Sequence, residues 1–241
     1  MSFRSDLFKG KTAVVSGGTQ GIGRGIAEAL AQLGARVYAA GLASQDGRAY
    51  GSDLISEASL DVTSEEQVQA FAAATPSIDI LVNCAGIILR REEFKLPVFE
   101  RVLDVNLTGT MRMCEALRPA LAASGGCIVN TASMLSFFGG GLVPGYAASK
   151  GGVAQLTKSL AIAYAEDGIR VNAVAPGWIA TPLTQALQDD ESRSRPILDR
   201  TPLKRWGTPE DVAQAVIFLS SGAAAFMTGV IMPVDGGYMV T

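Results

Sequence analysis

Short runs of β-branched and other apolar residues alternate along the chain with longer stretches of helical periodicity. The apolar runs predict strands at residues 12–16, 36–40, 80–83, 127–131, 170–175 and 231–234. A weak further strand ends near Leu60, after a polar, glycine-rich segment that does not suit a full crossover helix. Strands that are apolar on both faces are typical of a parallel sheet covered by helices on each side. The pattern therefore predicts a doubly wound α/β fold.

The length and polarity of the chain indicate a single domain with one excursion from the sheet. With 241 residues, 48% of them hydrophobic, one α/β domain over residues 1–241 is expected. Residues 183–206 are polar and contain Pro196 and Pro202, so they are expected to leave the sheet as a substrate loop. Ligands of such sheets bind at the carboxyl ends of the strands, where the chemistry-bearing residues are sought.

Composition excludes several classes of partner. The net charge is -3 and no block of lysine and arginine occurs, so no basic face for nucleic acid or an anionic membrane is expected. The three cysteines form no CxxC pair and histidine is absent, so no metal site is expected and a reducing compartment fits. Because no apolar run approaches the roughly 18 residues of a membrane helix, we expect a cytoplasmic protein.

A glycine-rich turn follows the first predicted strand and opens a helix. It reads SGGTQGIG, with Gly17, Gly21 and Gly23 among its glycines. Glycines let backbone amides approach a pyrophosphate, and the helix N-terminus adds a partial positive charge. The turn therefore predicts a dinucleotide site, and a tight turn without a ligand is the alternative because the order differs from GxGxxG.

The residues that would select between NAD and NADP leave both open. Dinucleotide sites usually carry an acidic residue about 20 positions after the turn, whereas here the second strand ends in Gly41 and Leu42. No basic residue stands at Leu42 or Gln20 to attract a 2′-phosphate, although Ser44 and Arg48 are within reach. NAD or NADP is therefore expected, with a slight preference for NAD.

A tyrosine, a lysine and a serine form a candidate catalytic group. Tyr146 and Lys150 are four positions apart on a predicted helix, so they share a face. A nearby ammonium favours the phenolate and brings the tyrosine toward the pKa range of a general acid or base. Ser133 follows a strand at the ligand-binding edge, where its hydroxyl would bond a substrate carbonyl or only cap a turn.

Taken together, these motifs resemble those of the classical short-chain dehydrogenases/reductases, with 3-oxoacyl-[acyl-carrier-protein] reductases as the nearest named members. The resemblance extends from about Thr12 to Gly237 and departs from the family at Ser16, Cys84 and Gly41. Beside SGGTQGIG, the motifs are NCAG at Asn83–Gly86, VNLTG around Asn106, a serine 13 positions before the tyrosine, YAASK at Tyr146–Lys150 and APGWIAT at Ala175–Thr181.

The resemblance implies a Rossmann-type fold and a catalytic tetrad. Tyr146 would give or take the proton while Ser133 polarises the carbonyl. Lys150 would lower the pKa of the tyrosine and hold the nicotinamide ribose, and Asn106 would anchor a proton-relay water. An amide bonded to backbone is the alternative for Asn106.

The family pattern also suggests which residues contact the cofactor. Some of these residues have alternative structural roles. Asp61 would cap the next helix, and Asn83 would tie adjacent strands. Pro176 and Gly177 would end a strand. The full set is Gly17, Gln20, Gly21, Ile22, Gly23, Gly41, Leu42, Asp61, Val62, Asn83, Ala85, Gly86, Tyr146, Lys150, Pro176, Gly177, Ile179 and Thr181.

The expected activity is hydride transfer between a nicotinamide cofactor and a secondary alcohol or ketone, with the cofactor supplying the redox chemistry. Mostly apolar residues are expected to contact the substrate, which predicts an uncharged or partly apolar small molecule. The alternatives are a catalytically silent nucleotide-binding regulatory protein and a dinucleotide-dependent epimerase or dehydratase. The resemblance further implies a homo-oligomer, most often a tetramer. The expected substrate contacts are Ser133, Met134, Phe138, Tyr146 and Trp178.

Overall fold

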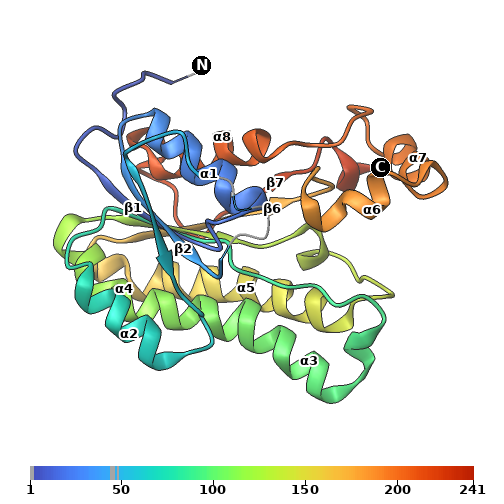
Figure 1. Cartoon of the computed structure of the whole chain (residues 1–241), viewed down its shortest axis with the longest axis horizontal. Coiled ribbons are helices and arrows are strands. Elements are labelled where there is room, and N and C mark those ends of the chain that lie inside the picture. The colour runs from blue at the N-terminus through green and yellow to red at the C-terminus, as the bar shows by residue number, and fades with distance from the viewer. Residues whose placement is uncertain (1–2, 44–46, 48) are drawn as a thin grey trace.

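The protein is built around one parallel sheet of seven strands, seen in a computed structural model that describes residues 3–43, 47 and 49–241 (Figure 1). The strand order is β3-β2-β1-β4-β5-β6-β7, and every neighbouring pair is parallel. The predicted doubly wound α/β fold of Rossmann type is confirmed. The strands are β1 (Thr12–Ser16), β2 (Arg36–Gly41), β3 (Ile55–Ser59), β4 (Ile80–Asn83), β5 (Cys127–Thr131), β6 (Arg170–Pro176) and β7 (Ile231–Val234).

Helices cover both faces of the sheet. One face carries α1 and α8, which pack on each other, and the opposite face carries α2, α4 and α5 (Figure 1). Short α6 and α7 lie beyond the sheet beside the C-terminus. The helices are α1 (Gly21–Gln32), α2 (Glu65–Ala74), α3 (Leu96–Leu103), α4 (Gly109–Ser124), α5 (Pro144–Ala163), α6 (Gln185–Gln188), α7 (Glu191–Arg200) and α8 (Pro209–Ser220).

Alternate residues of the central strands enter two separate cores. Val15 of β1 packs with Ile26 of α1 and Val216 of α8, whereas its neighbour Val14 packs with Leu117 of α4. All five side chains are fully buried. Because successive residues of a strand point to opposite faces, a strand covered on both sides must be apolar throughout. This explains the continuous apolar runs of the sequence.

The segments that depart from this regular pattern were predicted from the sequence. The weak third strand is β3 at the edge of the sheet, where Ser56 and Glu57 are exposed. Residues 183–206 leave the sheet as expected, forming α6 and α7 between β6 and α8. Leu187 and Ile197 are buried, so this excursion is packed against the rest of the chain.

Candidate active site and cofactor crevice

The glycine turn lies at the point where the strand order reverses between β1 and β4. Gly17 has a φ of +66°, and a Cβ built there would lie 2.7 Å from the backbone of Ala85. A Cβ on Gly23 would lie 2.1 Å from the carbonyl oxygen of Gly17. Side chains are therefore excluded at Gly17 and Gly23, and the backbone of the turn is packed against the end of β4. Sheets of this kind bind ligands at such a reversal.

The same crevice is bordered by the end of β6. Gly21 begins α1, and a Cβ built on it would lie 3.8 Å from the side chain of Thr181. Ile179 is buried and forms a β-bridge with Gly207, which directs the chain after β6 toward the N-terminus of α1. A glycine cradle, a helix N-terminus and a hydroxyl opposite suit the pyrophosphate of a dinucleotide.

The backbone is held by hydrogen bonds at the end of β2, where the adenosine ribose is expected. Gly41 and Leu42 offer no charged side chain there to distinguish NAD from NADP. The Thr19 hydroxyl donates to the carbonyl oxygen of Leu42 at 2.9 Å, while the Leu42 side chain is 67% exposed. The Tyr50 hydroxyl donates to the carbonyl oxygen of Gly18 and so rests on the glycine turn. Ser44 and Arg48, which the sequence placed within reach of a 2′-phosphate, lie outside the described residues.

Two predicted cofactor residues, Asp61 and Asn83, have partners within the chain, and their cofactor contacts stay predictions. The Asp61 carboxylate accepts bonds from the backbone and hydroxyl of Thr63, which hold the pKa of the carboxyl below its usual value. The Asn83 amide is buried and donates to Asn130 at 2.9 Å, tying β4 to β5. Val62 packs over Gly109 at the start of α4. The alternative of a tie between strands describes the contact of Asn83. Asp61 does not cap α2, because the N-cap is Ser64, whose hydroxyl accepts from the Gln67 amide.

Tyr146, Lys150 and Ser133 come together at the carboxyl ends of β4 and β5. Lys150 Nζ donates to the carbonyl oxygen of Thr131 at 2.6 Å and lies 5.7 Å from the centroid of the Tyr146 ring. The Ser133 hydroxyl accepts from the Leu135 amide at 3.1 Å, so it caps the turn, as its alternative role expected. It is also close enough to Tyr146 to move the pKa of the phenol downward. Gly86 lies beside them, since a Cβ built on it would be 3.7 Å from Lys150 Nζ.

Burial, rather than the neighbouring lysine, dominates the protonation of this group in the chain alone. It raises the pKa of Tyr146 to about 12 and lowers the pKa of Lys150 to about 8. The role of Lys150 in lowering the pKa of Tyr146 stays a prediction, because burial outweighs every other contribution in the chain alone. The physical reason is that both groups are removed from water, which penalises the phenolate and the ammonium alike.

Asn106 fixes the loop that follows β4. It is fully buried in a π-helical turn, Asp104–Thr108, and its Oδ1 accepts from the Ile87 amide at 2.8 Å. Its Nδ2 donates to the Ile87 carbonyl and to the Ser149 hydroxyl, each at 3.0 Å. The side chain therefore holds the Gly86–Ile87 backbone against α5, as the alternative for this residue expected. Its relay role stays a prediction.

Buried Glu93 was missed by sequence reasoning although it organises the site. One carboxylate oxygen accepts from the Tyr146 amide and the other from the Leu89 amide, both at 2.8 Å. A carboxylate at the first turn of α5 is favourable because the helix N-terminus carries a partial positive charge. Glu93 therefore places the first turn of α5 beside residues 87–91, which carry Arg90.

The substrate side is formed by aromatic rings. Trp178 meets Trp206 at 5.9 Å and Tyr238 at 6.2 Å, edge to face, and Phe138 stacks on Tyr238 at 6.4 Å. We call Phe138, Trp178, Trp206 and Tyr238 the aromatic cluster. The predicted contacts Phe138 and Trp178 belong to it, whereas Met134 is buried beneath Ser133 in a short 3₁₀ turn.

A cation on this cluster was also missed. The guanidinium of Arg90 lies 5.9 Å from the ring centroid of Trp178. Burial lowers the pKa of Arg90 and the charge of Arg193 lowers it further, whereas Tyr146 raises it. Arg90 is thus electrostatically coupled to the candidate proton donor. In the sequence, the pair Arg90-Arg91 directly after NCAGIIL indicates positive charge near the predicted active site.

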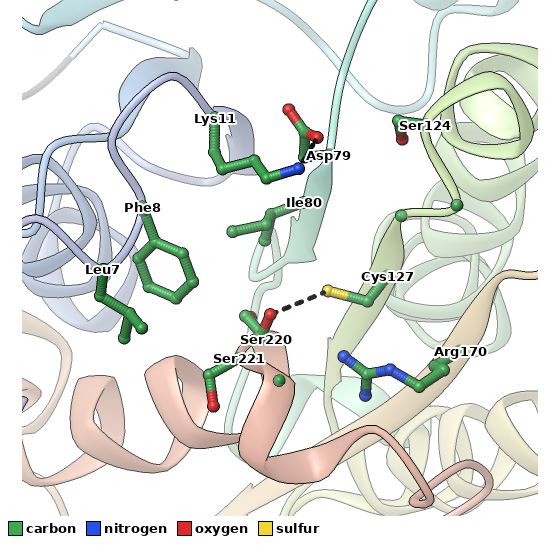
Figure 2. Close-up of a pocket in the computed structure, with 13 residues that line it drawn as sticks. Leu7, Phe8, Lys11, Asp79, Ile80, Ser124, Cys127, Arg170, Ser220 and Ser221 are labelled. Atoms are coloured by element: carbon green, nitrogen blue, oxygen red, sulfur yellow. Dashed lines mark hydrogen bonds and ion pairs between the residues drawn. The ribbon is translucent and has the colours of Figure 1, made fainter.

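A cavity of about 160 Å³ lies at the opposite edge of the sheet (Figure 2). It is lined at the amino ends of β4, β5 and β6 and contains the Lys11–Asp79 ion pair, 2.7 Å long. Across it, Cys127 Sγ lies 3.9 Å from the Ser220 carbonyl oxygen. None of the predicted site residues lines this cavity. It is distinct from the crevice formed by the glycine turn and the catalytic side chains.

Across the described ranges, no group of three or more histidine, cysteine, aspartate or glutamate residues is arranged to hold a metal ion. Within residues 3–43, 47 and 49–241, no helix is long and apolar enough to cross a membrane.

Comparison with known proteins agrees with this geometry. The profile of the family described as enoyl-(acyl carrier protein) reductase matches residues 17–239. The 2-dehydro-3-deoxy-D-gluconate 5-dehydrogenase of Bacillus subtilis is 43% identical, with 99% of each chain covered. The 3-oxoacyl-[acyl-carrier-protein] reductase of Chlamydia muridarum is 36% identical, covering 97% of this chain and 99% of the relative. A gluconate 5-dehydrogenase structure from Burkholderia cenocepacia, with NADP and tartrate, has a TM-score of 0.90 at 33% identity, covering 98% of both chains.

The chain belongs to the classical short-chain dehydrogenases/reductases. It is an NAD(P)-dependent oxidoreductase that transfers a hydride between a nicotinamide cofactor and the CH–OH group of a small molecule.

Proposed function

We propose that the enzyme interconverts a secondary alcohol and a ketone on a sugar acid, a polyhydroxylated molecule that carries a carboxylate. The substrate class rests on one observation above all, the Arg90 guanidinium on Trp178 beside Tyr146. A guanidinium binds a carboxylate through two parallel hydrogen bonds, which fixes the direction of the substrate as well as its charge. The names of the relatives, dehydrogenases of gluconate derivatives, support the same class.

In the oxidation direction the substrate hydroxyl lies between Ser133 and Tyr146. Tyr146 accepts the hydroxyl proton, and Ser133 donates a hydrogen bond to the oxygen as it becomes a carbonyl. Lys150 adds positive charge beside the tyrosine when it is protonated. Bound nicotinamide supplies the hydride acceptor for this chemistry. In reduction, Tyr146 returns the proton to the oxygen.

The chain's own residues are suited to hold the dinucleotide. Gly17, Gly21 and Gly23 would admit the pyrophosphate, and Thr181 would bond it from the opposite side of the crevice. Gly86 and Lys150 would border the nicotinamide ribose. These assignments stay predictions.

Cofactor choice is proposed to be permissive toward NADP. Neither Gly41 nor Leu42 offers a carboxylate that would repel a 2′-phosphate, and relatives with bound NADP support its acceptance. The preference for NAD expected from the sequence has no such support. Assembly as a homotetramer and a cytoplasmic location also stay predictions, drawn from the family resemblance and the composition.

The test is a pair of substrates that differ mainly in charge. D-Gluconate carries the carboxylate, and sorbitol is a similar polyol without it, so nicotinamide absorbance is followed with each in the presence of NAD or NADP. We expect turnover with the acid class, extended to related keto-deoxy acids. Equal or better turnover of uncharged polyols or thioesters would contradict the proposed substrate class.

Arg90→Gln sharpens this test. It should raise KM for the acid by about tenfold or more, in line with the loss of a charged hydrogen-bonding partner, and leave uncharged alcohols unaffected. Arg91→Gln is the matched control, because Arg91 is the exposed neighbour on the same loop. An equal effect of both substitutions would show that loop distortion, not carboxylate binding, is responsible.

A further inference from the structure

The aromatic cluster is joined to α7 by a side-chain hydrogen bond. The Trp206 indole N–H donates to the Ser194 hydroxyl at 3.0 Å, and Ser194 is buried. Trp206 in turn meets the ring of Trp178, on which Arg90 lies. The contacts form one continuous path from the loop after β4 to the first half of α7. Arg193, the residue before Ser194, is therefore held near the substrate side of the crevice.

Among the described residues, neither Arg90 nor Arg193 forms an ion pair with a carboxylate. The ion pair that α7 does form joins Arg195 to Asp199, at 3.9 Å. The Asp190 carboxylate accepts bonds from the Ser192 amide and hydroxyl through one oxygen, and the charge of Arg193 makes a smaller contribution to the lowered pKa of Asp190. Arg193 is near enough to Arg90 for its charge to lower the pKa of that guanidinium. Two converging cations of this kind repel each other until an anion lies between them.

A third group at the same place also lacks a partner. In the part of the chain that the structure describes, the Trp178 indole nitrogen is inaccessible to solvent and has no hydrogen-bond acceptor. A buried N–H without an acceptor is energetically costly, and folded proteins leave few such groups without a hydrogen-bond partner. An oxygen-rich anion brought to the cluster would supply the acceptor after a small shift of the ring.

We infer that Arg193 is the second carboxylate-binding residue of the active site: with Arg90 it holds the substrate's carboxylate between the loop after β4 and α7. The inference rests on the proposed function, since it assigns a further residue to recognition of the same acid. Arg90 approaches from the sheet and Arg193 from the excursion at residues 183–206. Binding of the acid therefore draws α7 toward the aromatic cluster and confers selectivity for acids over neutral polyols.

The experiment uses the protein's own fluorescence. The chain contains two tryptophans, Trp178 and Trp206, and both belong to the aromatic cluster. Tryptophan emission therefore reports on this place whether or not turnover occurs. D-Gluconate, with C4 and C5 hydroxy acids as further probes, is titrated into the enzyme saturated with oxidised cofactor, and sorbitol serves as the uncharged probe.

The variants are Arg193→Gln and Arg195→Gln. Arg195 lies on the same helix, is 76% exposed and pairs with Asp199, so its loss changes the charge of α7 by the same amount. We expect Arg193→Gln to raise Kd and KM for the acid by about tenfold or more, with kcat and the KM of neutral alcohols little changed. Arg195→Gln should stay within about twofold of the wild type, because exposed ion pairs contribute little. Arg193→Lys should recover part of the affinity, since it restores the charge without the planar fork.

Each outcome decides between the inference and the proposed function. Saturable acid binding that weakens only in Arg193→Gln supports the inference even if no sugar acid is turned over. Turnover of acids with equal affinity in the wild type and Arg193→Gln overturns the inference and leaves the proposed function intact. Absence of a tryptophan response to every hydroxy acid overturns the inference as well.

Discussion

The two walls of the active-site crevice are held in place by different means. On the cofactor side, the glycine turn packs against the backbone of Ala85, and Ser16 accepts bonds from the Cys84 and Ala85 amides. On the substrate side, side chains from four separate segments meet in the aromatic cluster, and arginines lie on their rings. The cofactor wall is therefore held mainly by backbone packing and hydrogen bonds to backbone amides, whereas the substrate wall is held by contacts between side chains.

This difference separates what the family shares from what each member recognises. A dinucleotide is bound through backbone amides, so its site tolerates few changes of conformation but requires few particular side chains. The substrate wall is free to change its side chains because the sheet and the glycine turn do not depend on them. In this chain we propose that Arg90 and Arg193 of the substrate wall adapt a common fold to an acid.

Tyr146→Phe should have the largest effect, because Tyr146 lies where the two walls meet. Removal of the phenolic hydroxyl should lower kcat by about 10²- to 10⁴-fold, the usual contribution of a general acid or base. The cofactor wall is untouched, so the affinity for NADPH, measured by nicotinamide fluorescence, should be retained. Substantial remaining turnover would refute the assignment of Tyr146 as proton carrier.

Lys150→Met should reveal how much stability is lost by burying the candidate catalytic lysine. The pKa of Lys150 falls from 10.5 to about 8 on folding, so the unfolded chain binds the proton first as pH decreases. The wild type therefore loses stability relative to the variant between pH 10.5 and about 8, and the difference is constant below that range. The change across the range should be about 3 kcal/mol at most.

Urea unfolding of the cofactor-free protein at the two ends of this pH range measures the effect. Ionisation of Tyr146 occurs in both proteins and cancels in their difference. Lys158→Met, an exposed change on the same helix, is the control. A difference between Lys150→Met and the wild type that does not vary with pH would contradict the lowered pKa.

Gly17→Ala should damage the cofactor wall through the backbone alone. The new Cβ would meet the backbone of Ala85 at 2.7 Å, and the residue would hold a φ of +66°. We expect the free energy of unfolding to fall by about 1–3 kcal/mol and the affinity for dinucleotide to decrease. Gly51→Ala is the control, because its Cβ would meet nothing within 4 Å. Equal stability of the two variants would show that the glycine turn is less constrained than its geometry indicates.

Leu42→Asp should have the smallest effect, confined to cofactor choice. A carboxylate after β2 would repel a 2′-phosphate and weaken NADPH binding by about tenfold, with NADH little affected. Leu42→Asn introduces a similar shape without charge and should leave both affinities near those of the wild type. Parallel titrations that show no selective loss of NADPH would place the 2′-phosphate away from Leu42.

The sequence by itself determined the fold, the cofactor wall and the tyrosine, lysine and serine of the site. These features are local: glycines are required where side chains are excluded, and four positions along a helix bring Tyr146 beside Lys150. The alternation of apolar runs and helices determined the sheet for the same reason, because strands covered on both faces need apolar residues at every position. Family resemblance then supplied roles that spacing alone left open.

Only the tertiary structure decided how the substrate wall is completed, by charged residues and by Trp206 and Tyr238, and how the candidate catalytic group is protonated. Arg90 lies on the ring of Trp178, and Glu93 accepts a hydrogen bond from the Tyr146 amide. The charge of Arg193 acts on Arg90. No local sequence pattern brings these residues together. The raised pKa of Tyr146 follows from its removal from water, and the extent of that removal depends on every element packed around it. Long-range contact and desolvation are properties of the folded chain, so short motifs do not encode them.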